Sequence, residues 1–162
     1  MKTLLLATVL ATIGQLALTA CPSSSGGSGA PWREAGDACY QAVLIPSKWT
    51  LARDTCEKLH PGAHLATVTS DMETWHMFNS FRDDVDLTVC RSFFHWIGVT
   101  DIGHDDVFKL IDGGDYENWS SFVEPLHKPN QEDCGAISPH TGSWYGDPCA
   151  NEHCFVCEVA AI

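Results

Sequence analysis

Residues 62–70 read Gly-Ala-His-Leu-Ala-Thr-Val-Thr-Ser, a short extended piece that separates two helical patterns. Four residues ahead of it are spaced to form one apolar stripe and predict a helix: Trp49, Ala52, Cys56 and Leu59. Ser47 can cap this helix at its start, and His60-Pro61-Gly62 ends it. The stretch therefore predicts a chain that leaves one helix, crosses briefly in extended form and enters a second helix.

The second helix begins where the quoted stretch ends. Ser70-Asp71-Met72-Glu73 has the spacing of a capping box, in which Ser and Glu satisfy the first free N–H groups. Four apolar residues then follow at intervals of three: Met72, Trp75, Phe78 and Phe81. We expect this stripe to pack against the core.

After Cys90 the sequence pattern changes from helical to strand-like. Phe93 to Val99 predicts a buried strand, and Cys154 to Val159 predicts a terminal strand. Between them, residues 101–143 are rich in Gly, Pro, Asp and Asn, and a loop that long in a compact domain is usually functional. Helices early and strands late indicate the α+β class with a large loop region.

Composition limits the classes of function. The 162 residues are 44% hydrophobic, which permits a buried core, and carry a net charge of −12. With nine basic residues against 21 acidic ones, the chain is unsuited to nucleic acid. We find no phosphate loop, hydrolase elbow or metalloprotease motif and expect no enzyme.

The N-terminal segment predicts secretion. Residues 1–20 have the charge and apolar pattern of a signal peptide, which predicts a mature chain that begins at Cys21, without a membrane span. Residues 21–31 are a Ser/Gly-rich leader, and 32–162 form one domain. Leu18-Thr19-Ala20-Cys21 also fits a lipobox, but eight cysteines form an even set that pairing would use completely.

Several short motifs occur in the order typical of one family. Besides the opening stretch these are Trp96-Ile97-Gly98-Val99, Asp112-Gly113, Tyr116, Asn118-Trp119, Glu124-Pro125, Glu132-Asp133-Cys134 and Phe155-Val156-Cys157-Glu158. In this combination the chain resembles the C-type lectin-like domains over about residues 32–160. The resemblance implies their fold: two helices and antiparallel strands with a long loop region, stapled by disulfides.

The resemblance also implies disulfide pairings. The two pairs that rest on matched motifs are Cys56–Cys157 and Cys134–Cys149. Cys39 resembles the hairpin cysteine of longer members, whose partner lies upstream, and Cys21 is the candidate. By elimination, Cys90 then pairs with Cys154. Cys154-Phe155-Val156-Cys157 after His153 could also suggest zinc, but zinc needs two further ligands and the two disulfides explain the spacing better.

Sugar-binding members hold calcium in the long loop with five oxygen side chains. Glu124 and Glu132 match two of these ligands, whereas Leu126 replaces an Asn and Trp144-Tyr145-Gly146 replaces Trp-Asn-Asp. Asp147 would fill the gap if its strand bulged by one residue, and Asn130 if it turned inward. Hard cations need six to eight oxygens, so we expect weak calcium binding at Glu124, Glu132 and Asp147. The expected ligand-binding surface comprises Glu124, Pro125, Asn130, Glu132, Trp144, Tyr145 and Asp147, with Trp144, Tyr145 and Trp119 as stacking surfaces if exposed.

Two further sites have competing interpretations. Asn118-Trp119-Ser120 is a glycosylation sequon, although Asn118 could instead bond to local backbone. A glutamate at position 73 can serve an auxiliary calcium ion in the family, but the capping box explains Ser70 and Glu73 without metal.

The sequence favours a secreted glycan-recognition protein that binds glycans or glycoproteins, and the resemblance to the family suggests a role in innate defence. The alternative is an extracellular matrix module that binds protein or calcium mineral through acidic side chains. Those side chains are Asp101, Asp105, Asp106, Asp112, Asp115 and Glu117.

Overall fold

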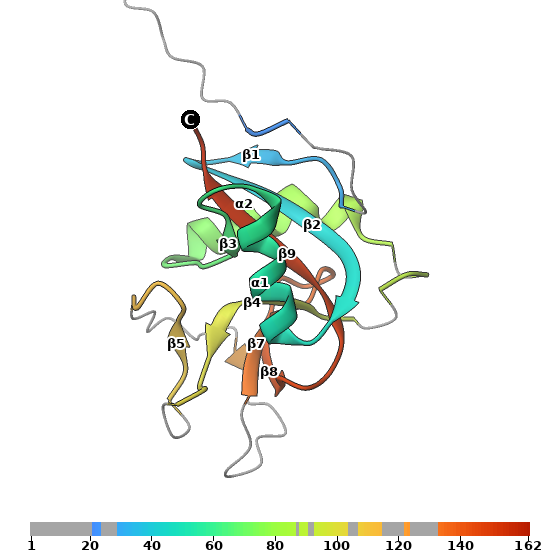
Figure 1. Cartoon of the computed structure of the whole chain (residues 1–162), viewed down its shortest axis with the longest axis vertical. Helices are drawn as coiled ribbons and strands as arrows, with labels where there is room; N and C mark the ends of the chain where they lie inside the picture. Colours follow the sequence, from blue (N-terminus) through green and yellow to red (C-terminus); the bar gives the residue numbers. More distant parts are fainter. Residues whose placement is uncertain are drawn as a thin grey trace, which may run out of the picture.

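The computed structural model describes residues 21–23, 29–86, 88–90, 93–103, 107–114, 122–123 and 133–162. Within them, two helices pack against one sheet (Figure 1). The elements in chain order are β1 (Arg33–Ala35), β2 (Ala38–Ser47), α1 (Trp49–Leu59), β3 (His64–Leu65), α2 (Asp71–Phe81), a 3-10 turn (Arg82–Asp84), β4 (His95–Thr100), β5 (Lys109–Leu110), β6 (Phe122–Val123), β7 (Asp133–Ile137), β8 (Trp144–Pro148) and β9 (His153–Ala160). The predicted α+β class is confirmed.

The last strand, β9, lies inside the sheet. The strand order is β1-β2-β9-β4-β7-β8-β6, with β3 paired to β9 and β5 to β4. Most pairs are antiparallel as expected, but β4–β9 and β6–β8 are parallel, so the sheet is mixed. Strand β9 lies between β2 and β4, antiparallel to β2 and parallel to β4, and it also pairs antiparallel with β3.

Helix α1 buries the predicted stripe. Trp49, Ala52 and Cys56 are buried, and Leu59 packs at the edge of the same cluster. The predicted cap is wrong, because Ser47 is the last residue of β2 and its hydroxyl donates to the Ile45 carbonyl. The free N–H of Trp49 instead donates to the carbonyl of Cys149 at 3.2 Å.

Helix α2 has the predicted capping box in a shifted form. The Ser70 hydroxyl accepts from the Glu73 N–H at 3.2 Å, and the Glu73 carboxylate accepts from the N–H and hydroxyl of Thr69. The reach to Thr69 rather than Ser70 still satisfies two donors with one glutamate.

The predicted apolar stripe of α2 is wrong at its N-terminal half. Met72 and Trp75 are 65% and 59% exposed, whereas Met77 and Phe81 are buried. A step of three residues turns the helix by about 300°, so each step drifts by about 60° and three steps by about 180°. Met72 and Phe81 therefore point to opposite sides, and only the second half of the stripe reaches the core.

Two tryptophans connect β4 to the start of α1. The Trp49 indole N–H donates to the Ile97 carbonyl, and the Trp96 indole N–H to the Ser47 carbonyl, each at 2.8 Å. Both rings are buried, so these bonds satisfy donors that water cannot reach. Gly98 allows β3 to lie close by, because a Cβ there would stand 2.6 Å from the Leu65 carbonyl oxygen.

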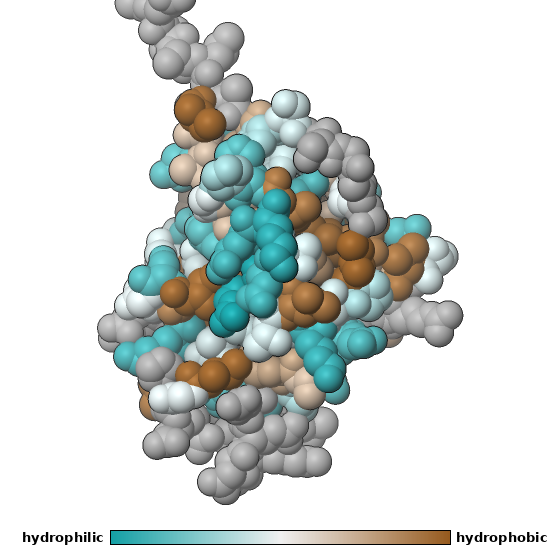
Figure 2. Space-filling model, in the orientation of Figure 1, coloured by the Kyte–Doolittle hydropathy of each residue, from teal (hydrophilic) through white to brown (hydrophobic). Residues whose placement is uncertain are grey.

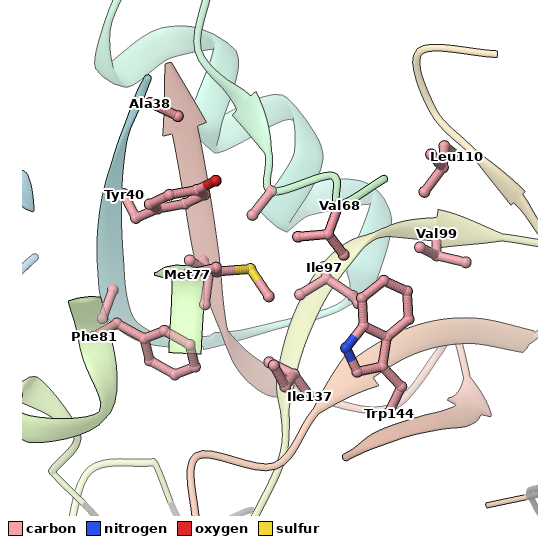
Figure 3. Packing of buried hydrophobic residues seen from close by; sticks show 13 residues of the cluster. Ala38, Tyr40, Val68, Met77, Phe81, Ile97, Val99, Leu110, Ile137 and Trp144 are labelled. Carbon is pink, nitrogen blue, oxygen red and sulfur yellow. The ribbon is translucent and has the colours of Figure 1, made fainter. Parts of the chain in front are cut away.

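Figure 3 shows the cluster of buried residues between α2 and the sheet, in which Tyr40, Met77 and Phe81 lie on one side and Trp144 on the other. His95 of β4 is also buried, and its ring lies 5.6 Å from that of Phe81. Burial lowers the pKa of His95 to about 3, and His153 and His140 act in the same direction. The imidazole is therefore uncharged at neutral pH.

All four predicted disulfides are present, and no cysteine is free. The two pairs that rested on weaker arguments, Cys21–Cys39 and Cys90–Cys154, each have a Cα–Cα distance of 5.6 Å. The leader is tied to the domain by the first of these and by Gly29, which forms a bridge to Val43. No helix in the described part of the chain is long and apolar enough to cross a bilayer.

Candidate functional site

The long loop is anchored at both ends beside β8. At one end, β6 pairs in parallel with β8, so that Val123 lies opposite Tyr145. At the other end, β7 pairs antiparallel with β8, and Asp133 lies opposite Pro148. Val123, which precedes the loop, therefore lies beside Tyr145, and Asp133, which follows it, lies beside Pro148, so that β8 residues 145–148 lie between these two described ends.

Alternation along β8 divides its side chains between two faces. Trp144 is 3% exposed and packs in the core beside Ile97 (Figure 3), so its indole face is not available to a ligand. Tyr145 lies on the other face and is half-buried, with its ring 4.7 Å from the ring of Phe94. Of the two stacking residues that the structure describes, only Tyr145 reaches the surface.

Asp147 shares the face of Tyr145 and is held by two donors. Its Oδ2 accepts from Asn151 Nδ2 at 2.8 Å and lies 2.7 Å from His153 Nε2. Burial by itself would raise the pKa of Asp147, but the hydrogen bonds from His153 and Asn151 outweigh that effect and lower it. The Asp147 carboxylate is therefore held in place by its hydrogen bonds with Asn151 and His153.

The described residues do not make a complete calcium site. The β7–β8 pairing runs without a bulge from Asp133–Pro148 to Ile137–Trp144, so the shift that would bring Asp147 into the missing position is not present there. One oxygen of Asp147 is also already engaged. Six predicted site residues lie outside the described residues: Asn118, Trp119, Glu124, Pro125, Asn130 and Glu132.

His153 is the residue that the sequence interpretation missed. Besides contacting Asp147, its ring lies 4.3 Å from Trp96 in an edge-on contact, which fixes the imidazole between β8 and β4. Only the turn between β8 and β9 brings it to Asp147, since the N–H of Asn151 closes that turn on Pro148. No spacing rule in the sequence indicates this contact.

A second polar cluster surrounds the start of α2, at the other end of the molecule from β8 (Figure 1). A cleft of about 460 Å³ lies between the β1–β2 turn and α2, with Asp37, Tyr40 and Glu73 in its lining. Beside it, Glu158 accepts from the Thr67 N–H at 2.8 Å. Burial raises the pKa of Glu158 to about 7.

Glu73 in this cluster accepts hydrogen bonds at the start of α2, as the predicted capping box requires. Its Oε2 accepts from both Thr69 donors, at 2.7 and 2.8 Å. The structural role of Ser70 and Glu73 predicted from the sequence is confirmed.

The architecture defines the class of protein: a disulfide-linked α+β domain in which the strands before and after the long loop, β6 and β7, flank β8 in a mixed sheet. The sequence model of the Lectin C-type domain matches residues 45–159. A relative, Lectin BRA-3 of Megabalanus rosa, is 33% identical over 135 residues, which cover 81% of this chain and 76% of the relative. The chain belongs to the C-type lectin-like domain family.

Solved structures show that this fold serves different proteins. The carbohydrate-recognition domain of the mouse scavenger receptor C-type lectin matches with a TM-score of 0.60 and 24% identity, covering 81% of this chain and 94% of its own. A calcium-independent type II antifreeze protein matches with a TM-score of 0.64 and 22% identity, covering 90% and 98%. At these identities the fold is shared, and function must be argued from the site.

Proposed function

We propose that this chain is a secreted, non-enzymatic recognition protein that binds glycans or glycoproteins, with innate defence as its setting. The observation that carries the proposal is the anchoring of the long loop around Tyr145 and Asp147. A binding surface carried by a loop on a rigid sheet is the usual arrangement for recognition. The 33% identity to a protein named as a lectin supports the same function.

The proposed contact surface combines loop residues with one face of β8. Glu124, Pro125, Asn130 and Glu132 would supply the loop's polar groups. Tyr145 would supply a ring on which a sugar can stack. Trp144 supports this surface from the core and does not touch the ligand.

A glycan array tests the proposal. The wild type is applied with calcium and with chelator, beside Glu124→Gln in the loop and Glu57→Gln, a matched control on the exposed side of α1. We expect specific glycans to be retained, partly surviving chelation, with Glu124→Gln weakened and Glu57→Gln unchanged. Absence of any specific glycan for the folded wild type would contradict the function.

Calcium should bind the loop weakly. Two carboxylates, Glu124 and Glu132, remain of the five expected oxygen ligands, and Asp147 is engaged by His153 and Asn151. Few ligands move the calcium Kd to about the millimolar range or weaker. Titration calorimetry on the wild type and Glu124→Gln measures it, and micromolar binding lost in the variant would reveal a complete site.

A second function, a matrix module that binds protein or calcium mineral, is favoured by the engaged Asp147 and by the net charge of −12. It predicts adsorption to calcium carbonate or to a basic protein without glycan binding. The same purified protein distinguishes the two, because adsorption to mineral should fall with salt whereas glycan binding should not.

A further inference from the structure

His95 is buried without a hydrogen-bond partner. Its side chain is 0% exposed, and neither ring nitrogen has a hydrogen bond. Burying a polar group without a hydrogen-bond partner destabilises the folded state, so such groups are rare and call for an explanation. An apolar ring such as Phe would fill the same place on β4 without that cost.

The sulfur atoms of one disulfide lie beside this imidazole. Cys90 Sγ, Cys154 Sγ and a ring nitrogen of His95 lie within 4.8 Å of one another. The parallel pairing of β4 with β9 sets His95 directly opposite Cys154, and Cys90 and Cys154 are both buried. Among the described residues, this is the one group of histidine, cysteine or carboxylate side chains close enough to hold a metal ion.

We propose that opening the Cys90–Cys154 disulfide converts this cluster into a zinc site, held by the two thiolates and His95. Two molecules of a thiol reductant supply two electrons and two protons: their sulfurs join in a new disulfide, and Cys90 and Cys154 become thiols. Zinc then replaces both thiol protons, which leave to solvent, and the His95 nitrogen donates its lone pair. A water molecule takes the fourth position, which completes the tetrahedral set that zinc prefers.

Charge and geometry favour zinc over a harder cation. Two thiolates and a neutral imidazole around Zn²⁺ sum to zero charge, which a buried apolar site tolerates far better than a free cation. Thiolate and imidazole are the soft and borderline ligands that zinc takes, unlike the carboxylates of a calcium site. Zn–S bonds of about 2.3 Å would separate the two sulfurs to about 3.8 Å, a small movement within one cluster.

The remaining disulfides make the opened state a folded one. Cys21–Cys39, Cys56–Cys157 and Cys134–Cys149 still join the same elements after Cys90–Cys154 opens. Zinc would restore the link between Cys90 and Cys154 and give His95 its missing partner. The cluster would then alternate between a disulfide in an oxidising setting and a zinc link in a reducing one.

Glutathione redox buffers test this at equilibrium. The oxidised protein is incubated at graded ratios of reduced to oxidised glutathione, with zinc or with chelator, and differential alkylation with peptide mass spectrometry reports each disulfide. Zinc at ten times its Kd should shift the opening of Cys90–Cys154 about tenfold toward oxidising ratios and leave the other three unchanged. An unchanged ratio for Cys90–Cys154 would overturn the proposal.

Variants assign the effect to His95. In His95→Phe the zinc-dependent shift should disappear, whereas His76→Phe, at a half-buried histidine on α2 outside the cluster, should keep it. If His95→Phe fails to fold, alkylation of the wild type after phosphine reduction gives an independent answer. Zinc should protect the thiols of Cys90 and Cys154 there, and their equal labelling with and without zinc would overturn the proposal.

Discussion

The position of Gly98 is set by the distance between β3 and β4. A Cβ at this residue would stand 2.6 Å from the Leu65 carbonyl oxygen and 2.9 Å from Thr67 Cγ2. Gly62, by contrast, has no atom near a built Cβ but has a φ of +85°. The two glycines are therefore required for different reasons, one for space and one for conformation.

A pair of substitutions separates these reasons. We expect Gly98→Ala to lower the free energy of unfolding by about 1–3 kcal/mol, because the core must move to admit the methyl group. Gly62→Asn should lower it much less, since Asn tolerates the left-handed region. Urea unfolding of both variants measures the difference, and equal losses would contradict the steric reason for Gly98.

Glu158 makes stability depend on pH. The buried carboxyl has a pKa raised to about 7, chiefly by burial and also by the charge of Glu73, with Thr67 and His64 acting in the opposite direction. Between the ordinary pKa and this value the folded state binds more protons than the unfolded state. The contribution of protonated Glu158 to the stability of the folded state is therefore present at acid pH and lost as the pH rises through about 7.

We expect Glu158→Gln to remove this loss of stability with rising pH. Between pH 5 and 8 the free energy of unfolding of the wild type should fall relative to the variant, by up to about 1.4 kcal/mol per pH unit at the steepest point. Chemical unfolding at several pH values measures it, with Glu57→Gln as the exposed control. Parallel pH profiles for the wild type and Glu158→Gln would contradict it.

At the scale of elements, α2 presents one methionine to the core and one to solvent. Met77 is 0% exposed and Met72 is 65% exposed. We expect Met77→Ala to lower the free energy of unfolding by about 2–5 kcal/mol and Met72→Ala by less than about 0.5 kcal/mol. Thermal or urea unfolding of the two variants compares the same change on one helix, and similar losses would show that the face is misassigned.

The same helix shows where sequence reasoning succeeds and where it stops. The start of α2 could be predicted because a cap is a local contact between Ser70 and Glu73. The buried face of α2 could not be predicted in the same way, because residues at intervals of three spread around half of the helix circumference. Which of them face the core depends on the tertiary fold. The stretch 62–70 and the strand around Trp96 were recognisable because their residues meet steric demands that few others satisfy.

The candidate site was less predictable for a similar reason. The family motifs indicated the long loop and β8, but the burial of Trp144 depends on which face of β8 meets the core. The partner of Asp147 depends on a turn that brings His153 back to it. Both are contacts between distant or turned segments, and no local pattern encodes them.

At the scale of the whole molecule, the disulfides close loops of very different length. Cys56–Cys157 spans 101 residues, and Cys21–Cys39 spans 18. On the chain-entropy account, the longer loop contributes about 1.5 kcal/mol more to stability. Cys56→Ala with Cys157→Ala should therefore destabilise the protein more than Cys21→Ala with Cys39→Ala. Denaturant unfolding checks the order, and the reverse order would contradict the entropic account for this chain.

The hydrophobic surface is divided into small areas. On the face drawn in Figure 2, apolar residues are scattered among hydrophilic ones. The exposed large apolar residues lie on several elements and include Leu51, Met72, Trp75 and Phe93. Scattered exposure of this kind is normal for a protein surface, so recognition is better sought at the loop and β8.

The place of β9 within the sheet has a consequence for how the protein is made. The ribosome synthesises β2 more than a hundred residues before β9, which is a delay on the order of ten seconds at ordinary rates of translation. Until β9 is synthesised, the strand that lies between β2 and β4 is missing. Cys56 and Cys90 are then without their disulfide partners, Cys157 and Cys154. Nascent chains therefore pass through a period in which Cys56 and Cys90 can pair with each other, and a disulfide isomerase would have to correct that error.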